Sequence, residues 1–140
     1  MKYTPSKINR WMFLKLPAAW LTGVRLTLID EDKCEVKVRF KWINQNPYRS
    51  MFWAVQGMAA ELTTGMLLTK CIQDSNANIS MLLVSNKSSF RKKAVGKITF
   101  TCSEGKVAKQ LINSTIQDIT SKAWLKVRGY DEEGDLVSEF

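Results

Sequence analysis

One ionisable side chain stands alone in a long apolar segment of the sequence. Between Arg49 and Lys70, Glu61 is the only residue that can carry a charge. An unpaired carboxylate is costly to bury, so a residue of this kind needs a partner or a task. Glu61 is therefore the first candidate for a catalytic residue.

Small residues flank Glu61 on the same side of the predicted helix. Gly57 and Gly65 lie four residues before and after it, and Thr64 lies one turn further on. Glycine inside a helix costs ~1 kcal/mol relative to alanine, so two of them need a reason. One interpretation is a groove in which a ligand approaches the backbone. The other is close packing against a second helix, with Glu61 paired to a buried Lys or Arg. The spacing leaves both open.

The chain has no histidine and three widely spaced cysteines, Cys34, Cys71 and Cys102. The lack of histidine excludes Ser-His and Cys-His nucleophile pairs and histidine metal ligation. Because the cysteines form no CxxC pair either, we predict no metal site. We expect the cysteines to be buried free thiols in the reducing cytoplasm.

The elements that hold Glu61 follow from the hydrophobic pattern. A strand from Val24 and a second strand are predicted to form a hairpin through the polar turn at 30–33. Asn46 and Pro47 predict the start of a long helix over 47–71, with Ser50 as a second candidate cap. Apolar residues surround most of this helix, which indicates that other structure encloses it. The second strand alternates apolar and charged residues, and its predicted buried face is Cys34, Val36, Val38, Phe40 and Trp42.

The rest of the pattern predicts strands near 79–85, 95–103, 121–130 and 136–140 and a shorter helix near 106–115. Two strands, a long helix and an antiparallel run of strands predict an α+β hotdog fold, in which an antiparallel sheet wraps around one long central helix. The length of 140 residues fits a single domain.

The segment 1–22 is predicted to be a helical segment packed on this domain. Lys15 and Pro17 interrupt its apolar run, and no cleavage pattern or spanning stretch follows, so we expect neither a signal peptide nor a membrane span. We expect its large apolar residues to pack into the core, with an interfacial membrane role as the alternative; these residues are Trp11, Phe13, Leu14 and Trp20.

Three segments of the chain resemble a known superfamily. The run Asn46-Pro-Tyr-Arg-Ser-Met-Phe-Trp-Ala-Val-Gln-Gly-Met-Ala-Ala-Glu61 is similar to the part of hotdog-fold thioesterases in which a loop asparagine leads into the central helix and an acidic residue follows. Residues 17–23 and 90–96 also resemble a poorly characterised bacterial, thioesterase-like branch of that superfamily.

The resemblance implies a role for each matching residue. Glu61 would be the general base, or less favourably the nucleophile, and the backbone N–H of Trp53 would polarise the thioester carbonyl. Asn46 would orient that carbonyl or the attacking water, and Ser80 would hold the water. Many active relatives carry His-Gly-Gly at the helix entrance, where this chain has Phe52-Trp53-Ala54. Substrate contacts are expected at Gly57, Thr64, Gly65 and, for the phosphates of coenzyme A, at Arg91, Lys92 and Lys93.

The implied activity is hydrolysis of an acyl-CoA or acyl-carrier thioester by a water molecule that Glu61 activates. Coenzyme A would be part of the substrate, and no separate cofactor is expected. The resemblance also implies a homodimer or a dimer of dimers, with each site between two subunits. The alternative is a hotdog protein that binds an acyl-CoA or fatty acyl chain without cleaving it. A net charge of +8 favours an anionic partner, but we predict no nucleic acid because the chain has no recognised motif for one.

Overall fold

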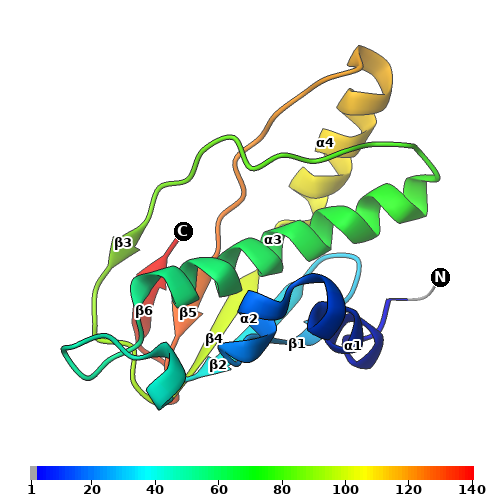
Figure 1. Cartoon of the computed structure of the whole chain (residues 1–140). Helices are drawn as coiled ribbons and strands as arrows, with labels where there is room; N and C mark the ends of the chain where they lie inside the picture. Colours follow the sequence, from blue (N-terminus) through cyan, green and yellow to red (C-terminus); the bar gives the residue numbers. More distant parts are fainter. Residues whose placement is uncertain (1–2) are drawn as a thin grey trace.

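The computed structural model describes residues 3–140, so Met1 and Lys2 of the predicted segment 1–22 lie outside the described residues. Figure 1 shows the long helix lying across a curved sheet. The elements in chain order are α1 (Pro5–Lys15), α2 (Pro17–Leu21), β1 (Arg25–Ile29), β2 (Cys34–Arg39), the 3-10 turn η1 (Trp42–Asn44), α3 (Trp53–Ser75), β3 (Ser89–Phe90), β4 (Lys97–Cys102), α4 (Gly105–Asp118), β5 (Arg128–Tyr130) and β6 (Leu136–Glu139).

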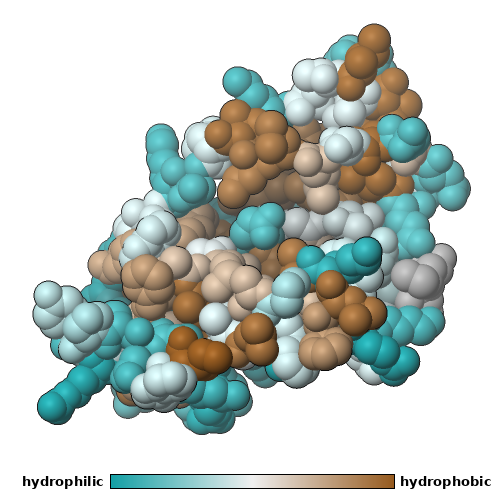
Figure 2. Space-filling model, viewed as in Figure 1, coloured by the Kyte–Doolittle hydropathy of each residue, from teal (hydrophilic) through white to brown (hydrophobic). Residues whose placement is uncertain are grey.

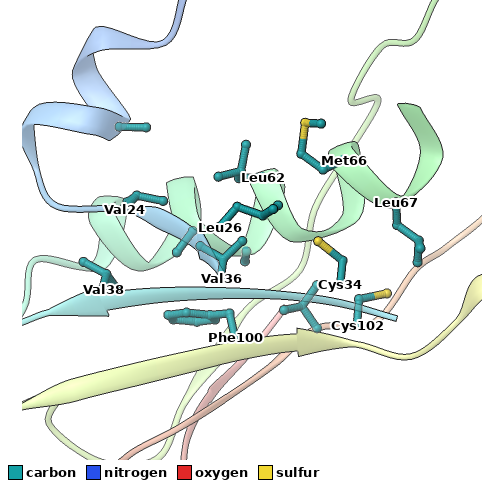
Figure 3. Packing of buried hydrophobic residues seen from close by; sticks show 14 of the residues in the cluster. Val24, Leu26, Cys34, Val36, Val38, Leu62, Met66, Leu67, Phe100 and Cys102 are labelled. Carbon is teal, nitrogen blue, oxygen red and sulfur yellow. The ribbon is translucent and has the colours of Figure 1, made fainter. Parts of the chain in front are cut away.

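The sheet has six strands in the order β1-β2-β4-β5-β6-β3, and every neighbouring pair is antiparallel. β2 and β4 are neighbouring interior strands, in which Cys34, Val36 and Val38 lie opposite Cys102, Phe100 and Ile98. These side chains are buried and point toward α3, as Figure 3 shows for residues of both strands and of the helix. The predicted α+β arrangement of an antiparallel sheet around one long helix is confirmed.

The central helix is covered by the sheet, and α2 and α4 pack against it as well. Val55, Ala59 and Leu62 are among its buried residues. Within 53–70 only Trp53 and Glu61 are exposed, and they mark the one open side of α3. The prediction that other structure encloses most of this helix is therefore confirmed, apart from that open side.

The helix also begins later than the sequence suggests, at Trp53 rather than at Pro47. The Asn46 side chain organises a turn instead, because its Oδ1 accepts hydrogen bonds from the backbone N–H groups of Tyr48 (2.8 Å) and Ser50 (3.3 Å). Its Nδ2 donates to Ser50 Oγ at 2.9 Å, so Ser50 does not cap α3. Asparagine and proline favour turns as much as helix starts, and here the turn forms.

Two predicted strands are missing or shortened. Residues 77–88 have no regular secondary structure, although a strand was predicted at 79–85, and β5 covers only the end of the predicted strand at 121–130. A strand needs a neighbour to pair with, and within residues 3–140 these segments have none along most of their length. Trp42 was also predicted to be buried, but it lies in η1 and is 82% exposed.

The N-terminal segment forms two helices that pack on the sheet edge. The side chain of Asn9 accepts a hydrogen bond from the Leu26 N–H (2.9 Å) and donates one to the Leu26 carbonyl (2.8 Å), which satisfies backbone groups of the edge strand β1. Ile8 and Met12 are the buried residues of α1. Trp11, Phe13 and Leu14 are exposed, so the prediction that they pack into the core is wrong; Trp20 is half-buried. No helix within residues 3–140 is long and apolar enough to cross a membrane.

Candidate active site

Glu61 lies near the middle of α3, on the open side of the helix. It is exposed, and among residues 3–140 it has no ion-pair partner. It borders a cavity of about 240 Å³ between α3 and the junction of α1 and α2. Most of the wall is apolar, and its residues are Lys15, Leu16, Pro17, Ala18, Ala19, Met58 and Leu62. We call this space the Glu61 cavity. The chain therefore presents a free carboxylate at the side of an apolar hollow.

The two glycines lie under this open side rather than under a second helix. A Cβ at Gly65 would meet only the Glu61 carboxylate, at 3.8 Å. A Cβ at Gly57 would meet the rings of Trp53 and Phe140 at 3.9 and 3.8 Å. Those are ordinary contact distances, so close helix packing does not explain either glycine within the described residues. Neither glycine lines the Glu61 cavity, so the groove interpretation stays a prediction, whereas pairing of Glu61 with a buried Lys or Arg does not fit this arrangement.

A second cavity, of about 550 Å³, lies at the N-terminal end of α3. We call it the α3 entrance cavity. It brings together the predicted residues Asn46 and Trp53 with all three cations of the loop before β4. The other lining residues are Pro47, Tyr48, Ser50, Met51, Phe52, Gln56, Phe90 and Ala94. Five predicted site residues, from two segments that are distant in sequence, thus line one cavity.

The backbone at the helix start can stabilise negative charge there. The Trp53 N–H has no hydrogen-bond partner among residues 3–140, and the N-cap residue Phe52 makes no side-chain capping bond. Free N–H groups and the positive end of the helix dipole favour an anion at this place. The indole of Trp53 packs edge to face with the Phe52 ring, with ring centroids 6.2 Å apart.

The three cations of the entrance cavity differ in what they already bind. Lys92 Nζ lies 2.6 Å from an Asp131 carboxylate oxygen and 2.8 Å from one of Asp135, and the hydrogen bonds to these carboxylates raise the pKa of Lys92. Lys93 Nζ donates to the Tyr48 carbonyl at 3.2 Å, and Arg91 has no ion-pair partner within residues 3–140. Arg91 and Lys93 are thus free to meet an anion, and Lys92 is not.

The acidic partners of Lys92 also form a cluster of their own. Asp131, Glu133 and Asp135 offer carboxylate oxygens within 4.8 Å of one another, which is the spacing of a cation site. The ammonium group of Lys92 already contacts all three carboxylates. These ion pairs connect the loop before β4 to the hairpin turn between β5 and β6.

Four predicted site residues border neither cavity: Gly57, Gly65, Ser80 and Thr64. Ser80 is exposed in the irregular segment 77–88 and borders neither cavity. Thr64 is half-buried, and its hydroxyl donates to the backbone carbonyl of Glu61 at 3.2 Å. The Thr64 hydroxyl therefore binds the helix backbone and not a cavity.

Glu61 and the helix entrance are separate within one chain. Trp53 and Glu61 are eight residues apart on α3, and at ~1.5 Å per residue this places them roughly 12 Å apart along the helix axis. Glu61 borders its own cavity, whereas Trp53 and Asn46 border the other. Within one chain Glu61 and Trp53 thus border separate cavities, which we call the two half-sites.

Gln56 is the site residue that sequence reasoning missed. Gln56 is 3% exposed and borders the entrance cavity. Its Oε1 has no hydrogen-bond partner within residues 3–140. A buried amide oxygen without a donor is costly. Its position in the apolar part of the helix, five residues before Glu61, is the signal that could have found it.

The sheet, the long helix and the hollows at its open side define a hotdog-fold protein. The chain belongs to the family described as a domain of unknown function, DUF4442, whose model matches residues 5–140. No curated protein matches the chain.

Solved structures share the fold at low sequence identity. A Pseudomonas aeruginosa protein of unknown function, described as a probable thioesterase, is 19% identical with a TM-score of 0.77, over 97% of this chain and 91% of that one. A protein of unknown function from Chlorobaculum tepidum is 15% identical with a TM-score of 0.80, over 97% and 91%. A thioesterase from Haemophilus influenzae is 12% identical with a TM-score of 0.71, over 99% and 87%. These likenesses establish the fold.

Proposed function

We propose that this protein is a thioester hydrolase that cleaves acyl-CoA or a related acyl-carrier thioester. The observation that carries the proposal is the free Glu61 carboxylate at the side of the apolar Glu61 cavity, on the open face of the central helix. Glu61 takes a proton from water, and the resulting hydroxide attacks the thioester carbonyl. The C–S bond then breaks, and the proton passes to the leaving thiolate, so that a carboxylic acid and a free thiol result.

The oxyanion that forms during attack needs a donor, and the start of α3 supplies one. The unpaired N–H of Trp53 and the helix dipole are suited to a developing negative charge. Asn46 is held by its bonds to Tyr48 and Ser50, so its role is to hold the entrance loop in shape. Ser80 would reach the water only if another element brought the segment 77–88 to the site.

A homodimer would unite the two half-sites. Since Glu61 and Trp53 are roughly 12 Å apart in one chain, we propose that Glu61 of one subunit acts beside the helix entrance of its partner. The segment before β3 supports this proposal, because it leads into the edge strand β3 and exposes a run of apolar residues, Met81, Leu82, Leu83 and Val84. Figure 2 shows hydrophobic side chains gathered in the upper part of the view, where the segments 77–88 and 119–126 run. An unpaired apolar edge favours pairing with another chain.

The charge of the entrance cavity fits the phosphate-bearing end of coenzyme A. Arg91 and Lys93 stand at its rim with their charges unpaired, and Phe90 and Tyr48 add rings beside them. Cations of this kind bind phosphate oxygens through charge-assisted hydrogen bonds. The substrate would then lie with its phosphates at this rim and its thioester at the helix start.

The test is turnover of an acyl-CoA panel by a Glu61→Gln variant, measured as release of free thiol. Gln keeps the shape of the side chain and removes its basicity, so we expect kcat to fall about 10²-fold or more. Asp118→Asn is the matched control, because Asp118 is an exposed carboxylate at the end of α4 and borders neither cavity. Turnover that is equal in Glu61→Gln and in the wild-type chain would refute the catalytic role.

The alternative function is binding of an acyl-CoA without cleavage. It is favoured by the large side chains at the helix entrance, where the rings of Phe52 and Trp53 stand beside the N–H groups that an oxyanion would use. Saturable binding of acyl-CoA by calorimetry, with no thiol released by the wild-type chain or by a Trp53→Gly variant, would establish this alternative.

A further inference from the structure

The first helix exposes apolar side chains next to the face that it buries. Ile8 and Met12 form the buried face, toward the core. Beside it Trp11 is 47% exposed and Leu14 is 71% exposed, and no element among residues 3–140 covers them. These two residues are three positions apart, so they are neighbours on one helical face. A small domain gains nothing from this outward apolar face by itself.

Cations border these apolar side chains. Lys7 and Arg10 precede Trp11 and Leu14 by four residues each, and Lys15 follows at the end of α1; all three are exposed. The first acidic residue of the chain is Asp30, so the whole segment before it carries only positive charge. Figure 2 shows hydrophobic and hydrophilic side chains interspersed over α1 and α2, in the lower right of the view.

A further exposed ring, on another side of α1 from Trp11, contacts α2. The ring of Phe13, which is 54% exposed, packs edge to face against Trp20 with centroids 4.8 Å apart. The Trp20 ring also contacts Arg25, whose guanidinium lies 4.2 Å from the ring centre. Leu21 is exposed at the end of α2. We call the set Lys7, Arg10, Trp11, Phe13, Leu14, Lys15 and Leu21 the α1 surface.

We propose that the α1 surface docks onto a lipid bilayer that carries anionic headgroups. Trp, Phe and Leu on a helix that lies in the membrane plane enter the boundary between headgroups and acyl chains, while Lys and Arg beside them contact anionic lipids. The charge of the surface selects this occupant, because it carries three cations and no acid. This inference goes beyond the proposed hydrolase activity and does not depend on it.

A second copy of this chain is the rival occupant, and the charges disfavour it. A two-fold symmetric contact places the same patch on both subunits against itself. Lys7, Arg10 and Lys15 of both copies would then lie within one contact, and like charges repel each other there. An anionic surface meets the same three cations favourably.

The test is co-sedimentation of the full chain with vesicles of equal parts phosphatidylcholine and phosphatidylglycerol, and with vesicles of phosphatidylcholine alone. We expect partition into the anionic vesicles and little into the neutral ones, with a blue shift of tryptophan emission on binding. The double variant Trp11→Ser with Leu14→Ser should lose about tenfold in partition. The triple variant Lys7→Gln, Arg10→Gln and Lys15→Gln should lose about tenfold or more.

Two controls separate docking from general attraction. The triple variant Lys106→Gln, Lys122→Gln and Lys126→Gln removes the same net charge from α4 and the segment after it, and should lose less than about threefold because those exposed lysines lie away from the contact. Trp42→Ser removes an exposed tryptophan outside the surface and should leave partition unchanged. All changed residues are exposed, so the circular dichroism spectra should match that of the wild-type chain.

The proposal is overturned if the Lys106, Lys122 and Lys126 control loses as much partition as the Lys7, Arg10 and Lys15 variant. It is equally overturned if Trp42→Ser loses as much as the Trp11 and Leu14 variant, or if the chain binds neutral vesicles as well as anionic ones. It is also overturned if the Trp11 and Leu14 variant binds vesicles normally but dissociates an oligomer in light scattering, since the α1 surface would then be an interface between copies.

Discussion

The indole ring of Trp53 lies against Gly57, one turn further along the same helix, where it would be 3.9 Å from an added Cβ. Phe140 reaches the same glycine from the end of the chain, at 3.8 Å. Gly57 therefore supports two aromatic rings at the open side of α3. Gly65 supports none, because only the Glu61 carboxylate lies near it. The two glycines flank Glu61 symmetrically in sequence, but only Gly65 leaves room beside the carboxylate.

Replacing Gly65 by Ala should separate stability from activity. The new methyl group would meet Glu61 Oε1 at an ordinary 3.8 Å, and alanine is the better helix former, so we expect the free energy of unfolding to rise by ~1 kcal/mol. If the groove holds substrate, the methyl group occupies part of it, and kcat/KM should fall. Urea unfolding and thiol-release assays measure the two effects. A more stable variant with undiminished kcat/KM would show that substrate does not approach Gly65.

Replacing Gln56 by Met should stabilise the chain. The change removes a buried amide oxygen that lacks a donor and keeps the length of the side chain, so the free energy of unfolding should rise by ~1 kcal/mol. Gln110→Met is the control, because Gln110 is exposed on α4 and its replacement should change little. A loss of stability in Gln56→Met would mean that the amide has a partner, such as a water molecule or a second subunit.

The pH dependence of stability should carry the signature of Cys34. Burial raises the pKa of this thiol from 9.0 to about 12, with the neighbouring Cys102 as a further cause. Below about pH 9 the thiol keeps its proton in both states. Between about pH 9 and 12 the unfolded chain has lost that proton and the folded chain has not, so the free energy of unfolding falls as the pH rises.

The measurement is urea unfolding at about pH 8 and about pH 10. A Cys34→Ala variant should show a smaller fall between the two, whatever its absolute stability. The three cysteines are free and buried, as the sequence suggested, so thiol reagents should modify the folded chain slowly. An equal fall in the variant would contradict the assignment of this pH dependence to Cys34.

The cations at the entrance cavity should contribute unequally to substrate affinity. Arg91→Gln and Lys93→Gln should each raise KM for an acyl-CoA several-fold, because each removes an unpaired charge from the rim. Lys92→Gln removes the same charge, but Lys92 is held by Asp131 and Asp135, so its effect on KM should be the smallest. Acyl thioesters without phosphate should show none of these differences. A larger KM effect for Lys92 than for Arg91 would contradict the proposed orientation of the substrate.

The sequence by itself predicted the elements whose hydrophobic periodicity is clear. Alternation from Cys34 to Arg39 predicted a strand with one buried face, and that strand is an interior strand of the sheet. The composition of the long apolar segment predicted α3, and the lone charge within it made Glu61 the candidate catalytic residue. Because periodicity depends only on neighbours along the chain, these elements could be predicted without knowledge of their surroundings.

The tertiary structure decided which apolar faces are covered. The same kind of apolar residue is buried at Met12 and exposed at Leu14, and the predicted strand at 79–85 finds no partner in the chain. It also separated Glu61 from Trp53 and gave each its own cavity. Burial and pairing depend on elements that are distant in sequence, so a residue's type and spacing determine what it can contact, and only the folded chain determines what it does contact.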